Sequence, residues 1–220
     1  NQAILSENPK ETVPSFDTDG HGTFVASVAC GGANPENLFI GAAPEAEMVI
    51  VKLKEAKEYL REYYFVDCDA RCYQENDLVA AVFYLQKVQE ELKRPLVICL
   101  AVGTSFGGHN GDSLLADILD IYATVRNRCV VVGTGNEAAR RHHYFNRFTD
   151  AQDMRTAEIR VGEGTQSFAV ELWSTLPNIV MVSVTSPSGE RTGMIPIRLG
   201  YLFDFLFTFE RTTITCLLYT

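Results

Sequence analysis

Several features that mark other classes of protein are missing from this sequence. No stretch approaches 18 uncharged apolar residues, and the nearest run, Tyr201 to Phe209, is short and interrupted by Asp204, so a membrane-spanning helix is not expected. Basic residues are scarce, with 19 Lys and Arg against 28 Asp and Glu and a formal net charge of -9. A field of that sign repels the phosphates of nucleic acids and of anionic membranes, so we expect neither as a partner.

The six cysteines are scattered and indicate no disulfide framework. Three of them lie in strongly apolar stretches, where a reduced thiol packs as a small hydrophobe. Cys68 and Cys72 could form half of a zinc site, but no second Cys or His pair with ligand spacing follows. We therefore expect no metal and no other cofactor. The chain starts at Asn1 without a charged-then-apolar leader, which we interpret as a cut and which leaves the localisation open.

What the sequence does contain is typical of a folded α/β protein. Its 220 residues, 46% hydrophobic and 21% charged, are enough for one domain, or for one domain with a small appended module. Apolar periodicity predicts alternating elements: strand 47–54, helix 78–92, strand 96–102, helix 115–125 and strand 129–132. The first helix has Asn76 or Asp77 as its expected cap, and strand 96–102 reads as fully buried. This order predicts a parallel sheet flanked by helices.

After about residue 157 the pattern changes to alternation of apolar and polar residues. Phe168, Val170 and Leu172 share one face, and an apolar run over 179–185 is followed by a turn at 187–189 and a further strand over 194–198. This predicts an antiparallel sheet. We expect a boundary near 150, with a partial α/β domain over 1–150 and an incomplete antiparallel β module or insertion over 151–220.

A single histidine, His21, stands between two glycines at the start of a small-residue helix pattern. Histidine can both take and return a proton near neutral pH, and flanking glycines let a substrate approach the ring, so His21 is a candidate general base. The structural alternative is a helix-entry histidine whose glycines serve only a turn. Asp17 and Asp19 are interpreted as turn or cap residues.

Four blocks, taken in order, resemble the signature blocks of the subtilisin-like serine proteases. They are His21-Gly-Thr-Phe-Val-Ala, Gly41-Ala-Ala-Pro44 before a strand, Ala101-Val102-Gly103 ending the next strand, and Val131-Val-Gly-Thr-Gly-Asn136. The resemblance covers 17–138 and implies hydrolysis of peptide or protein substrates by a Ser-His-Asp triad. It implies that His21 is the general base, that the segment 101–103 binds substrate, and that Asn136 donates to the oxyanion.

A narrower resemblance extends to about residue 198. The loop Gly103-Thr-Ser-Phe-Gly-Gly-His109, the His142-His143-Tyr144 segment after Asn136, and the stretches 171–173 and 185–190 look like the clostridial spore-germination subtilases. Those proteins carry a jelly-roll insertion between the Asn block and the nucleophile block. The resemblance therefore implies a jelly-roll-like second half and an association with spores.

Two parts of the family pattern are absent. The family's catalytic Asp lies well upstream of the histidine, where only 20 residues precede His21, and nothing after Asn136 fits the nucleophile block. Ser105 spells part of that block, but it precedes Asn136 and continues into Phe106-Gly-Gly, so we do not expect it to be the nucleophile. We therefore expect a fragment of a subtilisin-like endopeptidase that is inactive alone. The alternative is a non-catalytic pseudoprotease scaffold acting in binding or regulation.

Two further patterns are weighed and set aside. Gly133-Thr-Gly-Asn-Glu-Ala matches a dinucleotide-binding loop, but the residues after it have no apolar helical face and no acidic strand end follows. His142 and His143 are adjacent, so on an extended backbone they point to opposite sides and are poorly placed to share a metal.

Overall fold

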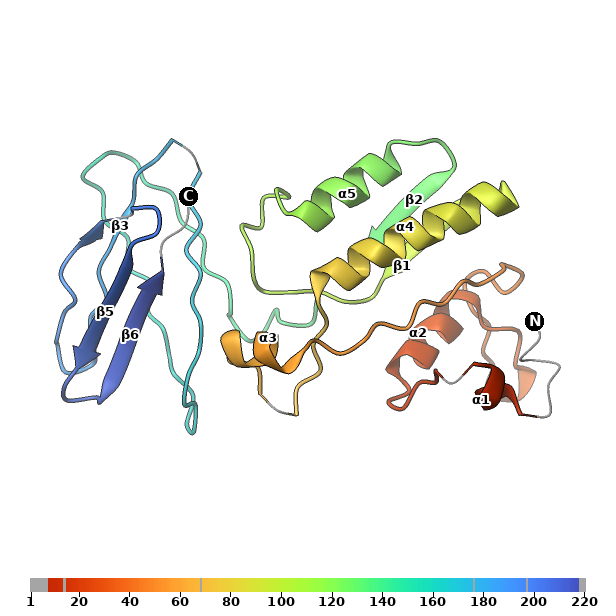
Figure 1. Ribbon diagram of the computed structural model, residues 1–220, viewed down its shortest axis with the longest axis horizontal. Coiled ribbons are helices and arrows are strands. Elements are labelled where there is room, and N and C mark those ends of the chain that lie inside the picture. The colour runs from red at the N-terminus through yellow and green to blue at the C-terminus, as the bar shows by residue number, and fades with distance from the viewer. Residues whose placement is uncertain (1–7, 14, 68, 176, 197, 218–220) are drawn as a thin grey trace. The chain divides into compact units, whose positions relative to one another are not determined.

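The computed structural model describes residues 8–13, 15–67, 69–175, 177–196 and 198–217. Two compact units divide the chain, Asn1–Val170 and Glu171–Thr220 (Figure 1). The first holds α1 (Pro9–Thr12), α2 (His21–Cys30), η1 (Pro35–Asn37), α3 (Glu58–Tyr63), α4 (Glu75–Leu92), β1 (Leu96–Leu100), α5 (Leu114–Ala123) and β2 (Arg128–Val132). This division falls later than the expected boundary near 150, and the assignment of domains to 1–150 and 151–220 stays a prediction.

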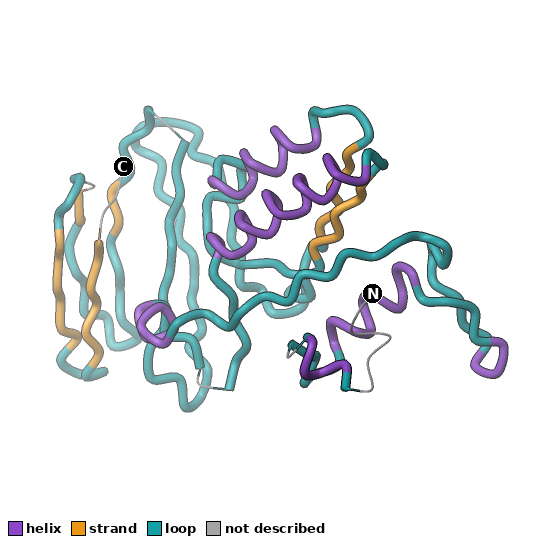
Figure 2. The backbone as a smooth tube through the Cα atoms, turned by 45° about the vertical axis from the view of Figure 1, so that its right-hand side comes forward, coloured by secondary structure: helices purple, strands orange, loops and turns teal. Residues whose placement is uncertain are grey.

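The centre of the first unit is a parallel pair of strands covered by two helices. β1 and β2 pair with Leu96 opposite Arg128 and Leu100 opposite Val132. Helices α4 and α5 lie beside the strands in Figure 2. A buried cluster of Val82, Leu85, Ile98 and Tyr122 joins α4, β1 and α5, and Val130 of β2 packs against it. The apolar residues of each helix recur every three to four positions, so one face of the helix meets the strands. The predicted strand-helix-strand unit with parallel pairing is confirmed.

The start of α4 differs from the prediction. The helix begins at Glu75 with Gln74 as its cap residue, and no side chain accepts from a backbone amide at this cap. Gln74 Nε2 donates to Asp77 Oδ2 at 3.1 Å. By contrast, the Ser113 hydroxyl caps α5 by accepting from the amide of Ala116 at 3.1 Å. Asn76 and Asp77 are therefore inside the first turn of α4 and are not its cap.

β1 is buried on one face only, which corrects the prediction of a fully buried strand. Ile98 is 4% exposed, whereas its neighbour Val97 is 63% exposed. Side chains alternate along a strand, and among the described residues α4 and α5 cover one side of the pair. Cys99 and Cys129 lie in the two strands and are exposed, so the expectation that thiols in apolar stretches are packed as core hydrophobes is wrong for these two.

The predicted strand over 47–54 does not form among the described residues. The segment is without regular secondary structure, and the one bridge close to it joins Glu55 to Tyr73. Val49 packs against the buried cluster, and Glu47 pairs with Arg94 at 2.8 Å. A β-branched run supplies strand propensity, but a strand also needs a neighbour to accept its backbone hydrogen bonds, and none is present for this segment in the described part of the chain.

The second unit is antiparallel, as predicted, and its first two strands are short pieces of the predicted runs 179–185 and 194–198. β3 (Met181–Val182) pairs with β4 (Ile195–Pro196), and β5 (Leu202–Phe207) pairs with β6 (Thr212–Leu217). The alternating residues Phe168, Val170 and Leu172 form no strand and are exposed. The turn over 187–189 is confirmed by the bond from the Gly189 amide to the Ser186 carbonyl at 3.0 Å.

Two glutamates join this turn to the turn between β5 and β6. Glu210 Oε1 accepts from the amide of Ser188 at 2.9 Å, and Glu190 Oε2 accepts from the amide of Phe209 at 3.1 Å. Hydrogen bonds from Ser188 lower the pKa of Glu210 to about 2. The two carboxylates therefore fix the end of the hairpin to the preceding loop.

Candidate active site

The carboxyl ends of β1 and β2 lie at the same edge of the parallel pair. Beyond the last paired residues, the Gly133 amide donates to the Leu100 carbonyl at 3.1 Å. The segments Ala101 to Gly103 and Gly133 to Asn136 therefore leave the sheet side by side. In open α/β sheets this edge is where ligands bind. Two of the three predicted site segments are thus brought to one edge by the strand pairing.

The segment Ala101 to Gly103, which the sequence predicts to bind substrate and which we call the substrate segment, has unpaired backbone groups. Ala101, Val102 and Gly103 are exposed, and within the described ranges their backbone groups take part in no hydrogen bond. Unpaired backbone donors and acceptors at a sheet edge are what an extended peptide uses to add a strand. The substrate-binding role of this segment stays a prediction.

His21 is the first residue of α2, as the sequence predicted. The residue before it, Gly20, has φ +89°, a left-handed conformation that favours glycine. Asp17 organises the turn: its Oδ1 accepts from the amides of Asp19 and Gly20 at 3.0 and 2.9 Å, and its Oδ2 accepts from the Thr23 amide and hydroxyl at 2.8 and 2.9 Å. The turn role predicted for Asp17 is confirmed.

These bonds also set the charge state of Asp17. Hydrogen bonds from the Thr23, Gly20 and Asp19 amides hold the pKa of the Asp17 carboxyl well below its ordinary value. The turn that presents His21 is therefore held by an ionised carboxylate. The side chain of Asp19 pairs with Arg71 at 3.3 Å.

The imidazole of His21 is exposed and forms no hydrogen bond with the part of the chain that the structure describes. In particular, no bond joins it to Ser105 or to Asn136. Ser105 lies in a bend in which the Phe106 amide donates to Thr104 Oγ1 at 3.0 Å. The general-base role of His21 stays a prediction.

Asn136 lies in the bend that follows β2, after Gly135, whose φ is +81°. Its side chain is exposed and has no hydrogen-bond partner among the described residues, so the amide is free to donate. Glu137, the next residue, pairs with His142 Nδ1 at 3.1 Å and with Arg140 at 3.7 Å. No helix follows Gly133 in this stretch, which agrees with setting aside a dinucleotide-binding loop.

One contact at this edge was not predicted. The rings of His109 and His143 lie 4.6 Å apart, centroid to centroid, and are tilted by 40°. His109 belongs to the loop after β1 and His143 to the loop after β2. A pair of exposed histidines so far apart in sequence carries no local signal, and only the two loops' strand pairing brings them within reach.

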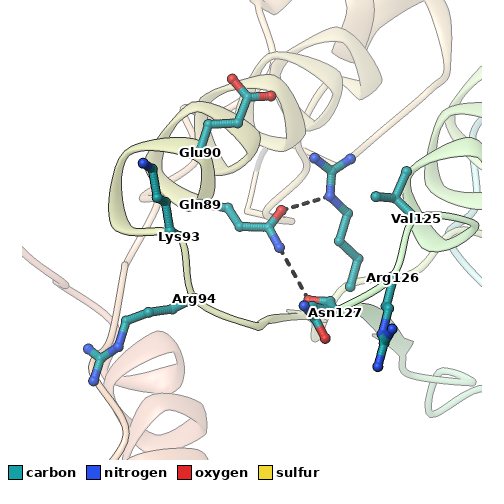
Figure 3. A pocket seen from close by; sticks show the side chains of 8 residues that line it. Gln89, Glu90, Lys93, Arg94, Val125, Arg126 and Asn127 are labelled. Atoms are coloured by element: carbon teal, nitrogen blue, oxygen red, sulfur yellow. Dashed lines mark hydrogen bonds between the residues drawn. The ribbon is translucent and has the colours of Figure 1, made fainter.

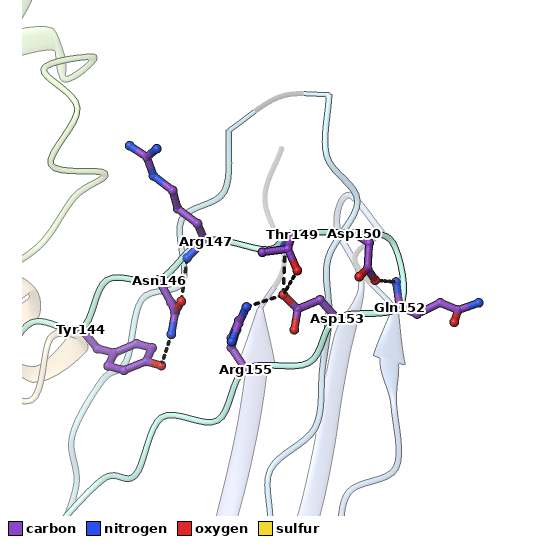
Figure 4. Close-up of polar contacts among 8 residues, drawn as sticks. All are labelled: Tyr144, Asn146, Arg147, Thr149, Asp150, Gln152, Asp153 and Arg155. Atoms are coloured by element: carbon purple, nitrogen blue, oxygen red, sulfur yellow. Dashed lines mark hydrogen bonds and ion pairs between the residues drawn. The ribbon is translucent and has the colours of Figure 1, made fainter.

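Residues 144–155 are held in place by polar contacts with one another (Figure 4). Asn146 donates to the Tyr144 hydroxyl at 2.7 Å, and Asp153 accepts from the amide and hydroxyl of Thr149. Hydrogen bonding, chiefly from the Thr149 amide, lowers the pKa of Asp153. The charged residues of this stretch therefore serve the local structure.

A shallow pocket of ≈ 240 Å³ lies at the opposite end of the strands, between the end of α4 and the start of β2 (Figure 3). Gln89 is its central residue: its Oε1 accepts from Arg128 Nε at 2.7 Å, and its Nε2 donates to the Asn127 carbonyl at 3.2 Å. The guanidinium of Arg128 also lies over the Tyr122 ring, 4.6 Å from its centre. The pocket is a packing feature at the amino ends of the strands, away from the predicted site segments.

No group of three or more His, Cys, Asp or Glu side chains is arranged to hold a metal ion in the residues that the structure describes. Cys72 is free, and Cys68, the other half of the pair considered from the sequence, lies outside the described residues. No helix within the described ranges has both the length and the apolar character needed to cross a membrane.

Comparison with known proteins adds two findings to this geometry. A family model of the subtilases matches residues 3–192. Among solved structures, the chain is similar to the CspB protease of Clostridium perfringens, with 27% sequence identity and a TM-score of 0.73. The match covers 98% of this chain and 43% of that protease, so the chain spans less than half the length of its relative. No curated protein sequence matches the chain.

Proposed function

We propose, because this chain belongs to the subtilase family, that it supplies the general base and the oxyanion donor of a serine endopeptidase. In this proposal His21 takes the proton of a serine hydroxyl as that oxygen attacks the scissile carbonyl, and returns it to the leaving amine. The Asn136 side chain donates to the oxygen that becomes negative in the tetrahedral intermediate. Peptides or proteins are the substrates.

The observation that carries the proposal is the parallel pairing of β1 and β2. It joins the residue before the segment Ala101 to Gly103 to Gly133, which precedes the bend that carries Asn136. In the proposal, a peptide adds a strand along the first segment, and its scissile carbonyl lies within reach of the Asn136 amide. Main-chain binding and oxyanion stabilisation would then be adjacent, as peptide-bond hydrolysis requires.

The accessibility of His21 at the start of α2 supports its proposed role. It is the first residue of the helix, so its side chain is at the end of the element and free of packing. Gly22 follows it, and neither flanking glycine adds a side chain that would block a substrate. In the proposal, the serine nucleophile and the carboxylate that orients the imidazole come from parts of the protease that this chain does not contain.

The second half of the chain has a separate role in the proposal. We assign 151–220 to a jelly-roll-like insertion, supported by the antiparallel pairs β3–β4 and β5–β6. The narrower sequence resemblance to the clostridial spore-germination subtilases supports a role in that process and an association with spores. Neither the insertion nor the spore association is needed for the chemistry at His21 and Asn136.

Peptide hydrolysis by the protein produced from its complete coding sequence tests the proposal. We expect His21→Ala to abolish activity, and Asn136→Ala to lower kcat by about 10²–10³, the loss that removal of the corresponding donor causes in subtilisin. His142→Gln is the matched control, because His142 is an exposed histidine that pairs with Glu137. Full activity in His21→Ala would overturn the assignment of the base.

The isolated 220-residue chain provides a second test. It is expected to hydrolyse no peptide above background and to resist labelling by a fluorophosphonate, because Ser105 has no bond to His21. Covalent labelling of Ser105 would contradict the proposal. A complete protein that folds and binds peptides but is inactive and unlabelled would instead identify a non-catalytic pseudoprotease scaffold.

A further inference from the structure

We propose that His109 and His143 are positioning residues, whose ring contact holds the loop of Asn136 against the loop of the substrate segment. The inference rests on the proposed function, since it names residues that act on the same site without touching the reacting atoms. It concerns two histidines that the chemistry assigned to His21 and Asn136 leaves unused.

The two loops that carry the site segments are joined at two points. The first is the hydrogen bond from the Gly133 amide to the Leu100 carbonyl at 3.1 Å. The second is the contact of the His109 and His143 rings, whose centroids lie 4.6 Å apart. Gly103 and Asn136 lie between these two attachments along their loops. A loop fixed at both ends has fewer conformations than one fixed at a single end, so the contact restricts where Asn136 can point.

The direction of the His109 ring is set independently of His143. His109 Nδ1 lies 2.7 Å from the carbonyl oxygen of Gly107. A carbonyl only accepts, so Nδ1 carries the hydrogen and donates it. The backbone of His109 is also left-handed, with φ +53°. The ring is therefore already held when it meets His143, and little rotamer freedom is lost in making the contact.

The two adjacent histidines of the second loop have different partners. His142 pairs with Glu137 of its own loop at 3.1 Å, whereas His143 meets His109 of the other loop. Neighbouring side chains on an extended backbone point to opposite sides, which permits this division. The contact of His142 is therefore confined to its own loop, and His143 attaches that loop to its neighbour.

The size of the effect follows from ring contacts in general. Such a contact changes the ratio of attached to detached conformations of the Asn136 loop by about two- to tenfold. Oxyanion donation is worth most in the transition state, so loosening Asn136 lowers kcat more than it raises KM.

The experiment compares His143→Ala with His143→Phe, which keeps a ring, and with His142→Gln, which keeps a donor for Glu137. In the 220-residue chain, NMR relaxation of the Gly135 amide and of the Asn136 side-chain amide should report greater mobility in His143→Ala. Both signals should return towards the original values in His143→Phe, and stay unchanged in His142→Gln. Both positions are exposed, and thermal unfolding checks that each of the three variants folds.

In the complete protein, His143→Ala should lower kcat by about two- to tenfold with little change in KM, and His143→Phe should restore most of it. Unchanged relaxation and unchanged kcat in His143→Ala would overturn the inference while leaving the role of His21 intact. If His21→Ala keeps full activity while His143→Ala still mobilises Asn136, the proposed function fails and the contact stands.

Discussion

The amide of Gly133 donates to the carbonyl of Leu100 across 3.1 Å, which extends the pairing of β1 and β2 beyond their last opposed residues, Leu100 and Val132. This bond fixes where both following loops begin. Since the loops carry the substrate segment and Asn136, the stability of the strand pair determines the geometry of the candidate site. Predictions about the core and about the site are therefore linked.

The core prediction contrasts two neighbouring residues of β1. Ile98 is 4% exposed and packs in the buried cluster, so Ile98→Ala should lower the free energy of unfolding by about 2–5 kcal/mol. Val97 is 63% exposed on the other face, and Val97→Ala should change the free energy of unfolding by no more than about 0.5 kcal/mol. Urea unfolding of both variants measures the difference, and equal losses would show that the burial of β1 is assigned to the wrong face.

The elements around this core were predictable because their signals are local. Leu78, Val82 and Leu85 recur at helical spacing, and Val82 and Leu85 are buried in α4 as that spacing requires. The strands of the parallel pair were found from apolar runs at Leu96 and Cys129. The predicted start of α4 was less accurate, because Gln74 and not Asn76 or Asp77 is the cap residue.

Features that depend on distant partners were not predictable from the sequence. The run over 47–54 has strand propensity, but pairing is decided by a neighbour that the local pattern does not reveal. Likewise, the apolar run from Tyr201 to Phe209 does not by itself predict that β5 pairs with β6 in a hairpin. The contact between His109 and His143 is set by two loops that meet only after β1 and β2 have paired. At the candidate site, the helix start at His21 was predictable, and the positions of His21 and Asn136 relative to each other remain a prediction.

Gln89 should be important for stability without being part of the site. It accepts from Arg128 Nε and donates to the Asn127 carbonyl, so it joins the end of α4 to the start of β2. Gln89→Ala leaves these groups without their partner and should cost about 1–3 kcal/mol. Gln86→Ala removes a bond to Glu90 on the same helix and should cost no more than about 0.5 kcal/mol. Similar unfolding midpoints in the two variants would contradict this role.

Acid should loosen the turn that presents His21. The folded-state pKa of Asp17 is depressed below its ordinary 3.8. The contribution of Asp17 to the stability of the turn is therefore fully present above pH 3.8, and it is lost as the pH falls towards the depressed pKa. Hydrogen exchange of the Thr23 amide should accelerate, relative to the intrinsic rate, as the pH is lowered through this range. Asp17→Asn should show the faster exchange at neutral pH and little further change on acidification. Thr23 protection that is the same in both proteins would rule out the carboxylate as the cause.

The exposed face of the parallel pair should make the isolated chain self-associate. Val97, Cys99, Cys129 and Val131 are all exposed on β1 and β2. Contiguous apolar surface of this kind favours association. Size-exclusion chromatography in a reducing buffer should show a concentration-dependent shift to larger species. The double change Val97→Thr and Val131→Thr should reduce the shift, whereas Val161→Thr with Val170→Thr, at exposed positions outside the strands, should not. A chain that is monomeric at all concentrations would contradict the prediction.

The most direct test of the proposed site is a crystal structure of the complete protein with a substrate-like peptide inhibitor bound. The inhibitor main chain is expected to pair with the segment Ala101 to Gly103, and Asn136 Nδ2 should lie about 2.7–3.1 Å from the position of the oxyanion. The His21 ring should lie on the same cleft, within hydrogen-bond reach of the nucleophile, at about 2.6–3.2 Å. An inhibitor bound elsewhere, or Asn136 and His21 too far apart to contact one scissile bond, would contradict the assignment of both residues.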